Sequence, residues 1–123
     1  MKVIVAGSRT FTDYHLLKNT LLQFMLEHKI MIEEIVSGTA KGADRLGEIF
    51  AEIYEIPIKK FIPDWETHGK SAGFKRNSEM ADYADMLVVF WDGESKGTKH
   101  MIDAAMKKGL LIKIIEFENV TMV

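Results

Sequence analysis

Residues 86–91 read Met-Leu-Val-Val-Phe-Trp, the strongest strand signal in this chain of 123 residues. A run with no polar position is typical of a central strand in a parallel sheet, where both faces of the strand are buried. A Gly-rich loop at 92–97 follows, and then a helical pattern at 98–108 that ends at Gly109, with lysines in its last turn. This stretch therefore predicts a strand, a loop and a helix in succession.

The same alternation continues on both sides of this stretch. Further strands are predicted at 3–6, 35–36, 58–62 and 110–117, a helix at 72–84, and a loop at 64–71. Two more helices have apolar stripes at Leu16, Leu17, Leu21, Phe24, Met25 and His28, with Thr12 or Asp13 as cap, and at Leu46, Ile49, Phe50, Ile53 and Tyr54. The inward positions expected on the helix at 72–84 are Phe74, Ala81 and Ala84.

Strands alternating with helices imply right-handed crossovers and a parallel sheet covered on both faces. The sequence therefore predicts an α/β fold, a three-layer, doubly wound and mostly parallel sheet of five strands. The length suits a single domain over 1–123, with its core at about 2–116 and a short C-terminal tail.

Composition excludes several classes of chemistry. The chain has no cysteine, which excludes disulfides, thiolate metal sites and a cysteine nucleophile, and favours a reducing cytoplasm. The four histidines are scattered without carboxylates at ligand spacing, so neither a metal nor a cofactor is expected. No apolar stretch reaches the length of a membrane span. Lys and Arg number 16 against 18 Asp and Glu, interspersed along the chain, so no bulk basic character points to nucleic acid.

The first loop that follows a predicted strand contains Gly7, Ser8, Arg9 and Thr10. In a doubly wound sheet, ligands bind at the carboxyl ends of the strands, near the switch in strand order. Glycine lets the backbone approach a ligand closely, and the arginine fork suits phosphate or carboxylate. The alternative is an ordinary turn with a solvated arginine.

The second loop follows the strand at 35–36 and frames small residues between two glycines. It runs from Ser37 to Asp44, and its candidate ligand-binding residues before the helix are Gly38, Thr39, Ala40, Lys41 and Gly42. Exposed N–H groups and the positive end of the following helix favour an anion there, although the Gly-Lys-Ser/Thr ending of a Walker loop is missing. Asp44 lies in the first turn of that helix, where it either stabilises the helix dipole or accepts from a ribose hydroxyl.

The third loop and the helix at 72–84 complete the candidate pocket. The loop supplies Asp92, Gly93, Ser95, Gly97 and Thr98, the last of which either caps a helix or binds ligand. Because the strand ends are expected to be neighbours, the N–H groups of the three loops should converge. Arg76 and Asn77 form a ligand-binding pair or a solvated face, and Trp65 covers the core or stacks on a base.

In this order the motifs resemble the YspA-like branch of the SLOG superfamily, found in bacteria and phages. The resemblance covers residues 2 to about 115. It rests on Gly7-Ser8-Arg9, Ser37 to Asp44, Pro63-Asp64-Trp65, Gly69 to Asn77 with Met80, and Phe90 to Thr98. It implies a Rossmann-like fold that binds nucleotides or nucleotide-derived ligands, often as a dimer. The first hypothesis is therefore a sensor or carrier of a nucleotide-like small molecule.

The wider superfamily includes the Lonely Guy phosphoribohydrolases, which cleave the N-glycosidic bond of nucleoside 5′-monophosphates. Arg76 is similar in position to their catalytic arginine, and Gly97-Thr98 resembles their phosphate-binding Gly-Thr. The glutamate expected two or three positions later is absent, because Lys, His and Met follow Thr98. If the chain is a hydrolase, the candidate catalytic residues are Arg76, Asp44 and His100.

The segment 37–44 also resembles the Ser-Gly-x-Ala-x-Gly-x-Asp loop of the DNA-processing protein A family. This leaves a single-stranded DNA-binding module as a third hypothesis. Such binding needs a basic groove with stacking aromatics. The residues that would supply one are Arg9, Lys41, Lys70, Lys75 and Arg76, with Trp65.

Overall fold

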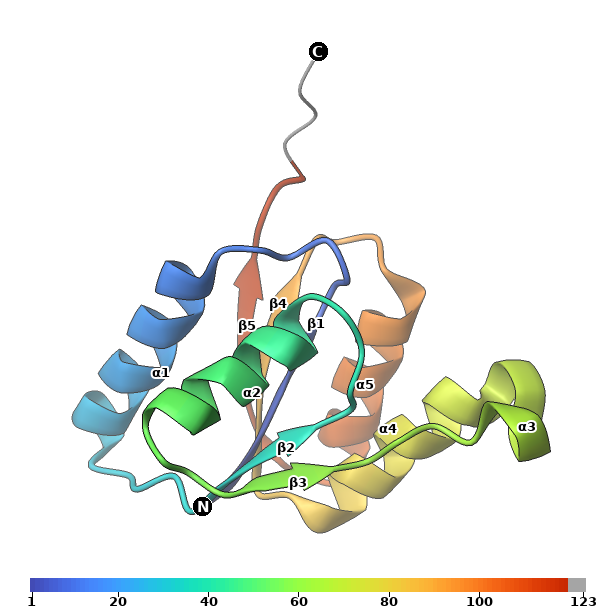
Figure 1. Ribbon diagram of the computed structural model, residues 1–123, viewed down its shortest axis with the longest axis horizontal. Helices are drawn as coiled ribbons and strands as arrows, with labels where there is room; N and C mark the ends of the chain where they lie inside the picture. Colours follow the sequence, from blue (N-terminus) through green and yellow to red (C-terminus); the bar gives the residue numbers. More distant parts are fainter. Residues whose placement is uncertain (120–123) are drawn as a thin grey trace.

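The computed structural model describes residues 1–119 and contains one sheet of five parallel strands in the order β3-β2-β1-β4-β5 (Figure 1). The predicted doubly wound α/β sheet is confirmed, and every strand pair is parallel. The strands are β1 (Lys2–Gly7), β2 (Glu34–Ser37), β3 (Ile58–Lys60), β4 (Met86–Trp91) and β5 (Leu111–Glu116).

Helices cover both faces of this sheet and give the three predicted layers. In Figure 1, α1 and α2 lie on one face, and α4 and α5 lie on the other. The helical segments are α1 (Tyr14–His28), α2 (Ala43–Ile53), α3 (Trp65–His68), a single 3-10 turn η1 (Gly69–Ser71), α4 (Ala72–Tyr83) and α5 (Lys96–Lys107). Within residues 1–119, no helix has both the length and the apolar character needed to span a membrane.

The apolar run of β4 is buried on both sides, as predicted. Val88 and Phe90 pack in the cluster that contains Leu17 of α1 and Phe50 of α2. The alternate residues of β4 point the other way and join a second cluster, formed with α4 and α5. Since successive side chains of a strand point to opposite faces, a strand between two helical layers has no position for a polar residue.

The strand order creates a crevice between β1 and β4. The chain builds outward from β1 through β2 to β3, and then returns to place β4 on the other side of β1. Gly7 pairs with Phe90, so the carboxyl ends of these two strands lie next to each other. The loops that leave them run to opposite faces of the sheet, which opens the space where doubly wound proteins bind ligands.

The segment at 64–71, predicted as a loop, is instead helical. Asp64 caps α3 by accepting a hydrogen bond from the backbone N–H of Thr67 at 3.1 Å. Gly69, at φ 55°, ends α3, and η1 then leads directly into α4. The aspartate before Trp65 is the capping signal that the polar composition of this segment obscured.

Some predicted side-chain positions are wrong. Phe74 is 46% exposed, because α4 docks through a face that contains Asn77 and Met80. Ile53 is also exposed, at the C-terminal end of α2.

Of the predicted caps, Asp13 caps α1 by accepting from Leu16 N at 3.0 Å. Ser95 caps α5, which therefore begins two residues before Thr98. The end of the expected C-terminal tail, 120–123, lies outside the described residues.

Candidate functional site

A cleft of about 90 Å³ lies at the carboxyl ends of the central strands. It occupies the switch point between β1 and β4, where the topology predicts a ligand. Its lining comprises Gly7, Arg9, Ala40, Asp44, Arg76, Asn77, Ser95, Gly97 and Thr98, with Ala6, Met80 and Met101 as apolar side chains. The loops after β1, β2 and β4, together with α4, therefore meet in one place.

Arg76 of α4 crosses the cleft toward the loop after β2. Its Nη1 donates to the carbonyl oxygen of Gly38, and its Nε donates to Asn77 Oδ1 at 2.9 Å. Among residues 1–119, Nη2 has no hydrogen-bond partner. Burial lowers the pKa of Arg76, Asp44 raises it and Arg9 lowers it, yet a guanidinium remains charged at neutral pH. Two nitrogens of the arginine, Nε and Nη1, are thus bonded to the protein, and Nη2 is left for a ligand.

Asp44 lies in the first turn of α2 and is 4% exposed. Its Oδ2 accepts from the backbone N–H of Ala40 at 3.2 Å. Burial raises the pKa of Asp44 to about 6, although the amide of Ala40 and the charge of Arg76 act in the opposite direction. A carboxyl group that titrates so near neutral pH can exchange a proton with a ligand in the cleft.

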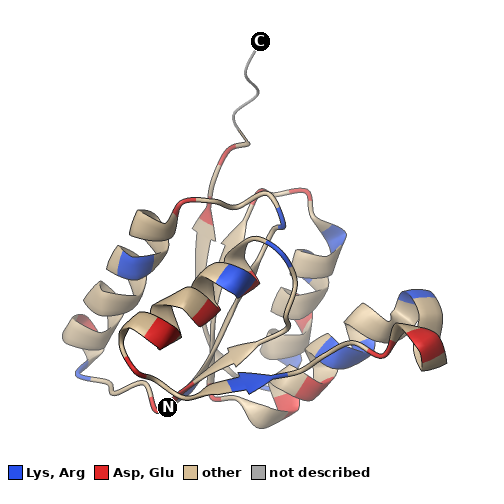
Figure 2. Ribbon diagram, in the orientation of Figure 1, with Lys and Arg blue, Asp and Glu red and all other residues tan. Residues whose placement is uncertain are grey.

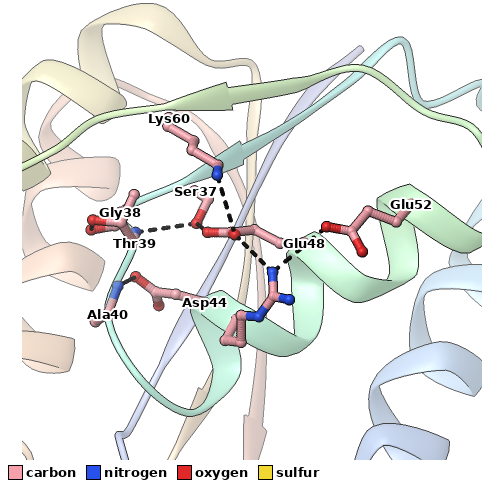
Figure 3. A network of polar contacts seen from close by, with 9 residues as sticks. Ser37, Gly38, Thr39, Ala40, Asp44, Glu48, Glu52 and Lys60 are labelled. Atoms are coloured by element: carbon pink, nitrogen blue, oxygen red, sulfur yellow. Dashed lines mark hydrogen bonds and ion pairs between the residues drawn. The ribbon is translucent and has the colours of Figure 1, made fainter.

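A second buried carboxylate, that of Glu48 in α2, supports the loop after β2 through Ser37 (Figure 3). The hydroxyl of Ser37 donates to Glu48 Oε2 at 2.6 Å and accepts from the backbone N–H of Thr39 at 3.1 Å. Glu48 also meets Arg45 Nη1 at 3.1 Å and Lys60 Nζ at 3.8 Å through Oε1. Ser37 and Glu48 therefore form a buried scaffold beneath the candidate site.

This scaffold determines which groups the loop presents to the cleft. The N–H groups of Thr39 and Ala40 are bonded to Ser37 and Asp44, so neither is free for the anion that the sequence led us to expect. Thr39 adopts φ 66°, an uncommon conformation for a β-branched residue, and its Oγ1 donates to Gly38 O at 2.6 Å. The loop thus directs a carbonyl oxygen, rather than amides, toward Arg76.

The loop after β4 is held by its own side chains. Asp92 Oδ1 accepts from the N–H groups of Glu94 at 2.9 Å and Ser95 at 2.8 Å, and these bonds lower the pKa of Asp92. Asp92 N donates to Ser8 Oγ at 3.1 Å, which ties the loops after β1 and β4 together. Ser95 Oγ accepts from Thr98 Oγ1 at 3.0 Å. Ser8 and Asp92 thus shape the cleft without lining it.

Two comparisons decide the family. A model of the YspA, cpYpsA-related SLOG family matches residues 1–68. The Gene 61 protein of Mycobacterium phage D29 is 33% identical over an alignment 122 residues long, and the match covers 94% of this chain and 95% of that protein. The chain belongs to the YspA, cpYpsA-related SLOG family. The resemblance seen in the sequence motifs is therefore confirmed.

A solved structure shares the fold of this SLOG protein. The X-ray structure of DNA processing protein A (DprA) from Streptococcus pneumoniae matches with a TM-score of 0.72 at 19% identity. The match covers 97% of this chain and 51% of DprA, so the chain spans about half of the length of that protein. The Rossmann-like architecture is confirmed by this likeness.

Several predicted site residues lie outside the cleft of the SLOG domain. Thr10 Oγ1 donates to Asn119 Oδ1 at 2.7 Å, and Lys41 is exposed. Gly93, at φ 85°, has open space around it. Gly42, at φ 78°, has a packing role, because a Cβ there would lie 2.4 Å from the carbonyl oxygen of Ser8.

Two further candidates lie close to the cleft. His100 Nδ1 is 3.2 Å from Asn77 Nδ2, and its ring stacks on Phe74 with centroids 4.2 Å apart. Trp65 lies near Gly73, since a Cβ on that glycine would be 3.6 Å from Trp65 Cη2 and 3.6 Å from Arg76 Nη2. The sequence analysis assigned no site role to five further contributors, although two of them, Ser37 and Met80, belong to the motifs it quoted. They are the buried pair Ser37 and Glu48, and the apolar Ala6, Met80 and Met101. The spacing of Asp44 and Glu48, one helical turn apart, was the signal that could have revealed the second carboxylate.

Proposed function

We propose that the chain binds a nucleotide or nucleotide-derived phosphate ligand in the cleft at the carboxyl ends of β1 and β4, as a sensor or carrier. The observation that carries the proposal is Arg76, a partly buried guanidinium whose Nη2 has no partner among residues 1–119. Among the described residues 1–119, the cleft is lined by two arginines, Arg9 and Arg76, and by one carboxyl group, Asp44. An anion such as phosphate would balance that excess and form charge-assisted hydrogen bonds.

The small size of the cleft supports a ligand of which only one part lies inside it. At about 90 Å³ it is smaller than the roughly 300–1,000 Å³ of pockets that enclose a whole ligand. The polar lining suits a phosphate or a sugar, and the rest of the molecule would extend outside. Membership of the SLOG family supports a ligand of the nucleotide class.

Calorimetric titration with ribose 5-phosphate, nucleoside 5′-monophosphates and ADP-ribose tests the proposal. We expect binding to the wild type, and an affinity at least about tenfold lower in Arg76→Ala, because a charge-assisted hydrogen bond is lost. Lys75→Ala is the matched control, since it removes one positive charge from the exposed side of α4 and should leave affinity unchanged. Wild-type protein that binds none of these compounds at millimolar concentration would refute the proposal.

A second candidate function is a nucleoside 5′-monophosphate N-glycosidase. The observation in its favour is the raised pKa of Asp44, about 6, in the same cleft as Arg76. A carboxyl group with such a pKa can act as a general acid or base at neutral pH. The test uses chromatography to detect free base released from nucleoside monophosphates. Wild-type activity that Asp44→Asn abolishes would support it, and wild-type protein that releases no base would exclude it.

Single-stranded DNA binding has weaker support. At 19% identity the likeness to DNA processing protein A concerns the fold alone. In Figure 2, basic and acidic residues are interspersed along the helices, so the charge distribution gives little support for DNA binding. Binding that falls steeply with salt would favour this function; absence of retardation of single strands at low salt would end it.

A further inference from the structure

Trp65 exposes an aromatic ring near the first turn of α4, the helix that carries Arg76. Despite its size, Trp65 is 51% exposed. A Cβ placed on Gly73 would lie 3.6 Å from Trp65 Cη2 and 3.6 Å from Arg76 Nη2. The edge of the indole and the guanidinium nitrogen that lacks a partner within residues 1–119 therefore flank the same glycine.

The backbone around Trp65 is held in place by local hydrogen bonds. Asp64 caps α3, and the N–H of Gly69 donates to the carbonyl oxygen of Trp65. Ser71 Oγ donates to His68 O at 2.9 Å, which ties η1 back to α3. In Figure 1, α3 stands at the side of the domain next to the first turn of α4. The indole is thus presented from an ordered element.

The glycine at position 73 is not required by the backbone or by packing. Its φ is not in the left-handed region, and the nearest atoms to a Cβ there would be at ordinary contact distance. Glycine is nevertheless a poor helix former, and this one lies in the first turn of α4. Because position 73 is a glycine, no Cβ lies at the point that is 3.6 Å from both Trp65 Cη2 and Arg76 Nη2.

We infer that Trp65 is a stacking platform for the nucleobase of a ligand whose phosphate is held by Arg76. The inference rests on the proposed function and adds the residue that would hold the base of the nucleotide. Stacking on tryptophan tolerates any base, because every base has an aromatic face. The ribose spans the distance between the phosphate in the cleft and the base outside it, in agreement with the small volume of the cleft.

Two classes of probe separate the contribution of the base from that of the phosphate. Calorimetry measures the affinities of ribose 5-phosphate and of AMP, GMP, CMP and UMP for wild type, Trp65→Ala and Trp65→Phe. We expect at least one nucleotide to bind wild type about 10- to 100-fold more tightly than ribose 5-phosphate, the range that base stacking provides. In Trp65→Ala this advantage disappears while ribose 5-phosphate binds as before, and Trp65→Phe retains most of it.

Phe74→Ala is the matched control, because Phe74 is 46% exposed on the same helix as Gly73 and stacks on His100. We expect nucleotide affinity to be unchanged in this variant. Tryptophan emission gives an independent signal: nucleotide should quench the wild type but not Trp65→Phe, in which only Trp91 remains.

The outcomes separate this inference from the proposed function. Equal affinities of wild type for ribose 5-phosphate and for all four nucleotides would overturn the platform and leave the phosphate site standing. Loss of nucleotide affinity in Phe74→Ala but not in Trp65→Ala would also overturn it. If neither ribose 5-phosphate nor any nucleotide binds, the platform and the proposed function both fail.

Discussion

Arg76 Nη1 donates a hydrogen bond to the carbonyl oxygen of Gly38, and this contact joins α4 to the loop after β2 across the cleft. The two residues are 38 positions apart in the sequence. A carbonyl is a neutral acceptor, so the positive charge of the guanidinium is not neutralised by this contact and favours a phosphate oxygen at Nη2. The position of Arg76 therefore depends on the shape of the loop at Gly38.

Replacing Gly38 by alanine should disturb the site more than the fold. The new Cβ would lie 2.8 Å from Arg76 Nη1 and 2.9 Å from Asp44 Oδ2. The end of the arginine side chain can move away, so we expect a loss of only about 1 kcal/mol in the free energy of unfolding. The affinity for ribose 5-phosphate should fall about tenfold as the guanidinium is displaced. Calorimetry and urea denaturation measure the two effects.

Replacing Gly42, in the same loop, by alanine should instead disturb the fold. Gly42 adopts φ 78°, and a Cβ there would lie 2.4 Å from the backbone oxygen of Ser8. A backbone atom cannot move aside cheaply, so we expect a loss of about 3 kcal/mol or more. Equal destabilisation by alanine at Gly38 and Gly42 in urea denaturation would contradict this account.

The protonation of Asp44 should make stability depend on pH. Its pKa rises from 3.8 to about 6 on burial, so between these values the folded state binds more protons than the unfolded state. Stability therefore falls as pH rises through this window, by about 3 kcal/mol in total, and the loss is nearly complete at about pH 7. Asp44→Asn should lack this component. Urea denaturation of both proteins from pH 4 to pH 7 measures the difference, and parallel curves would refute the prediction.

The hydrogen bond between Ser37 and Glu48 should be important for stability. Ser37→Ala leaves Glu48 Oε2 and the N–H of Thr39 without their shared partner in a buried position. We expect a loss of about 2–3 kcal/mol, typical of a buried bond to a charged group. Arg45→Ala, which breaks a partly exposed ion pair to the same carboxylate, should cost under about 1 kcal/mol. Hydrogen exchange at the Thr39 amide should accelerate only in Ser37→Ala.

His100 should control Asn77 through its protonation state. Asn77 Oδ1 accepts from Arg76, so its Nδ2 donates and His100 Nδ1 must be unprotonated. Burial lowers the pKa of His100, Lys107 lowers it further, and Asp103 opposes them. Because the folded pKa is depressed, this group stabilises the fold above about pH 6.5 and the stabilisation is lost as pH falls. Histidine NMR titration should give a pKa closer to 6.5 in Asn77→Ala, and an unchanged value would contradict the coupling.

The sequence predicted the fold because the alternation of apolar strands with amphipathic helices is local information. The apolar run at 86–91 predicted β4 with its correct ends. Ligands of doubly wound sheets bind at the carboxyl ends of the strands, and this rule predicted the position of the cleft. Two details depended on tertiary contacts. Asn77 is polar but faces inward, because it bonds within the site, whereas the apolar Phe74 points outward. The pairing of Ser37 with Glu48 joins two elements, and no periodicity encodes it.

The cleft is divided between two stretches of the chain that meet only at the centre of the sheet. Asp44 and the loops after β1 and β2 belong to the first stretch, whereas Arg76 and the start of α5 belong to the second. β1 pairs with β2 on one side and β4 on the other, so the two walls are joined through β1. A ligand that touches both walls would act as a non-covalent cross-link, and its binding free energy would oppose separation of the two halves of the domain. The slowest-exchanging amides of β4 would then report occupancy of a site that no residue of β4 lines.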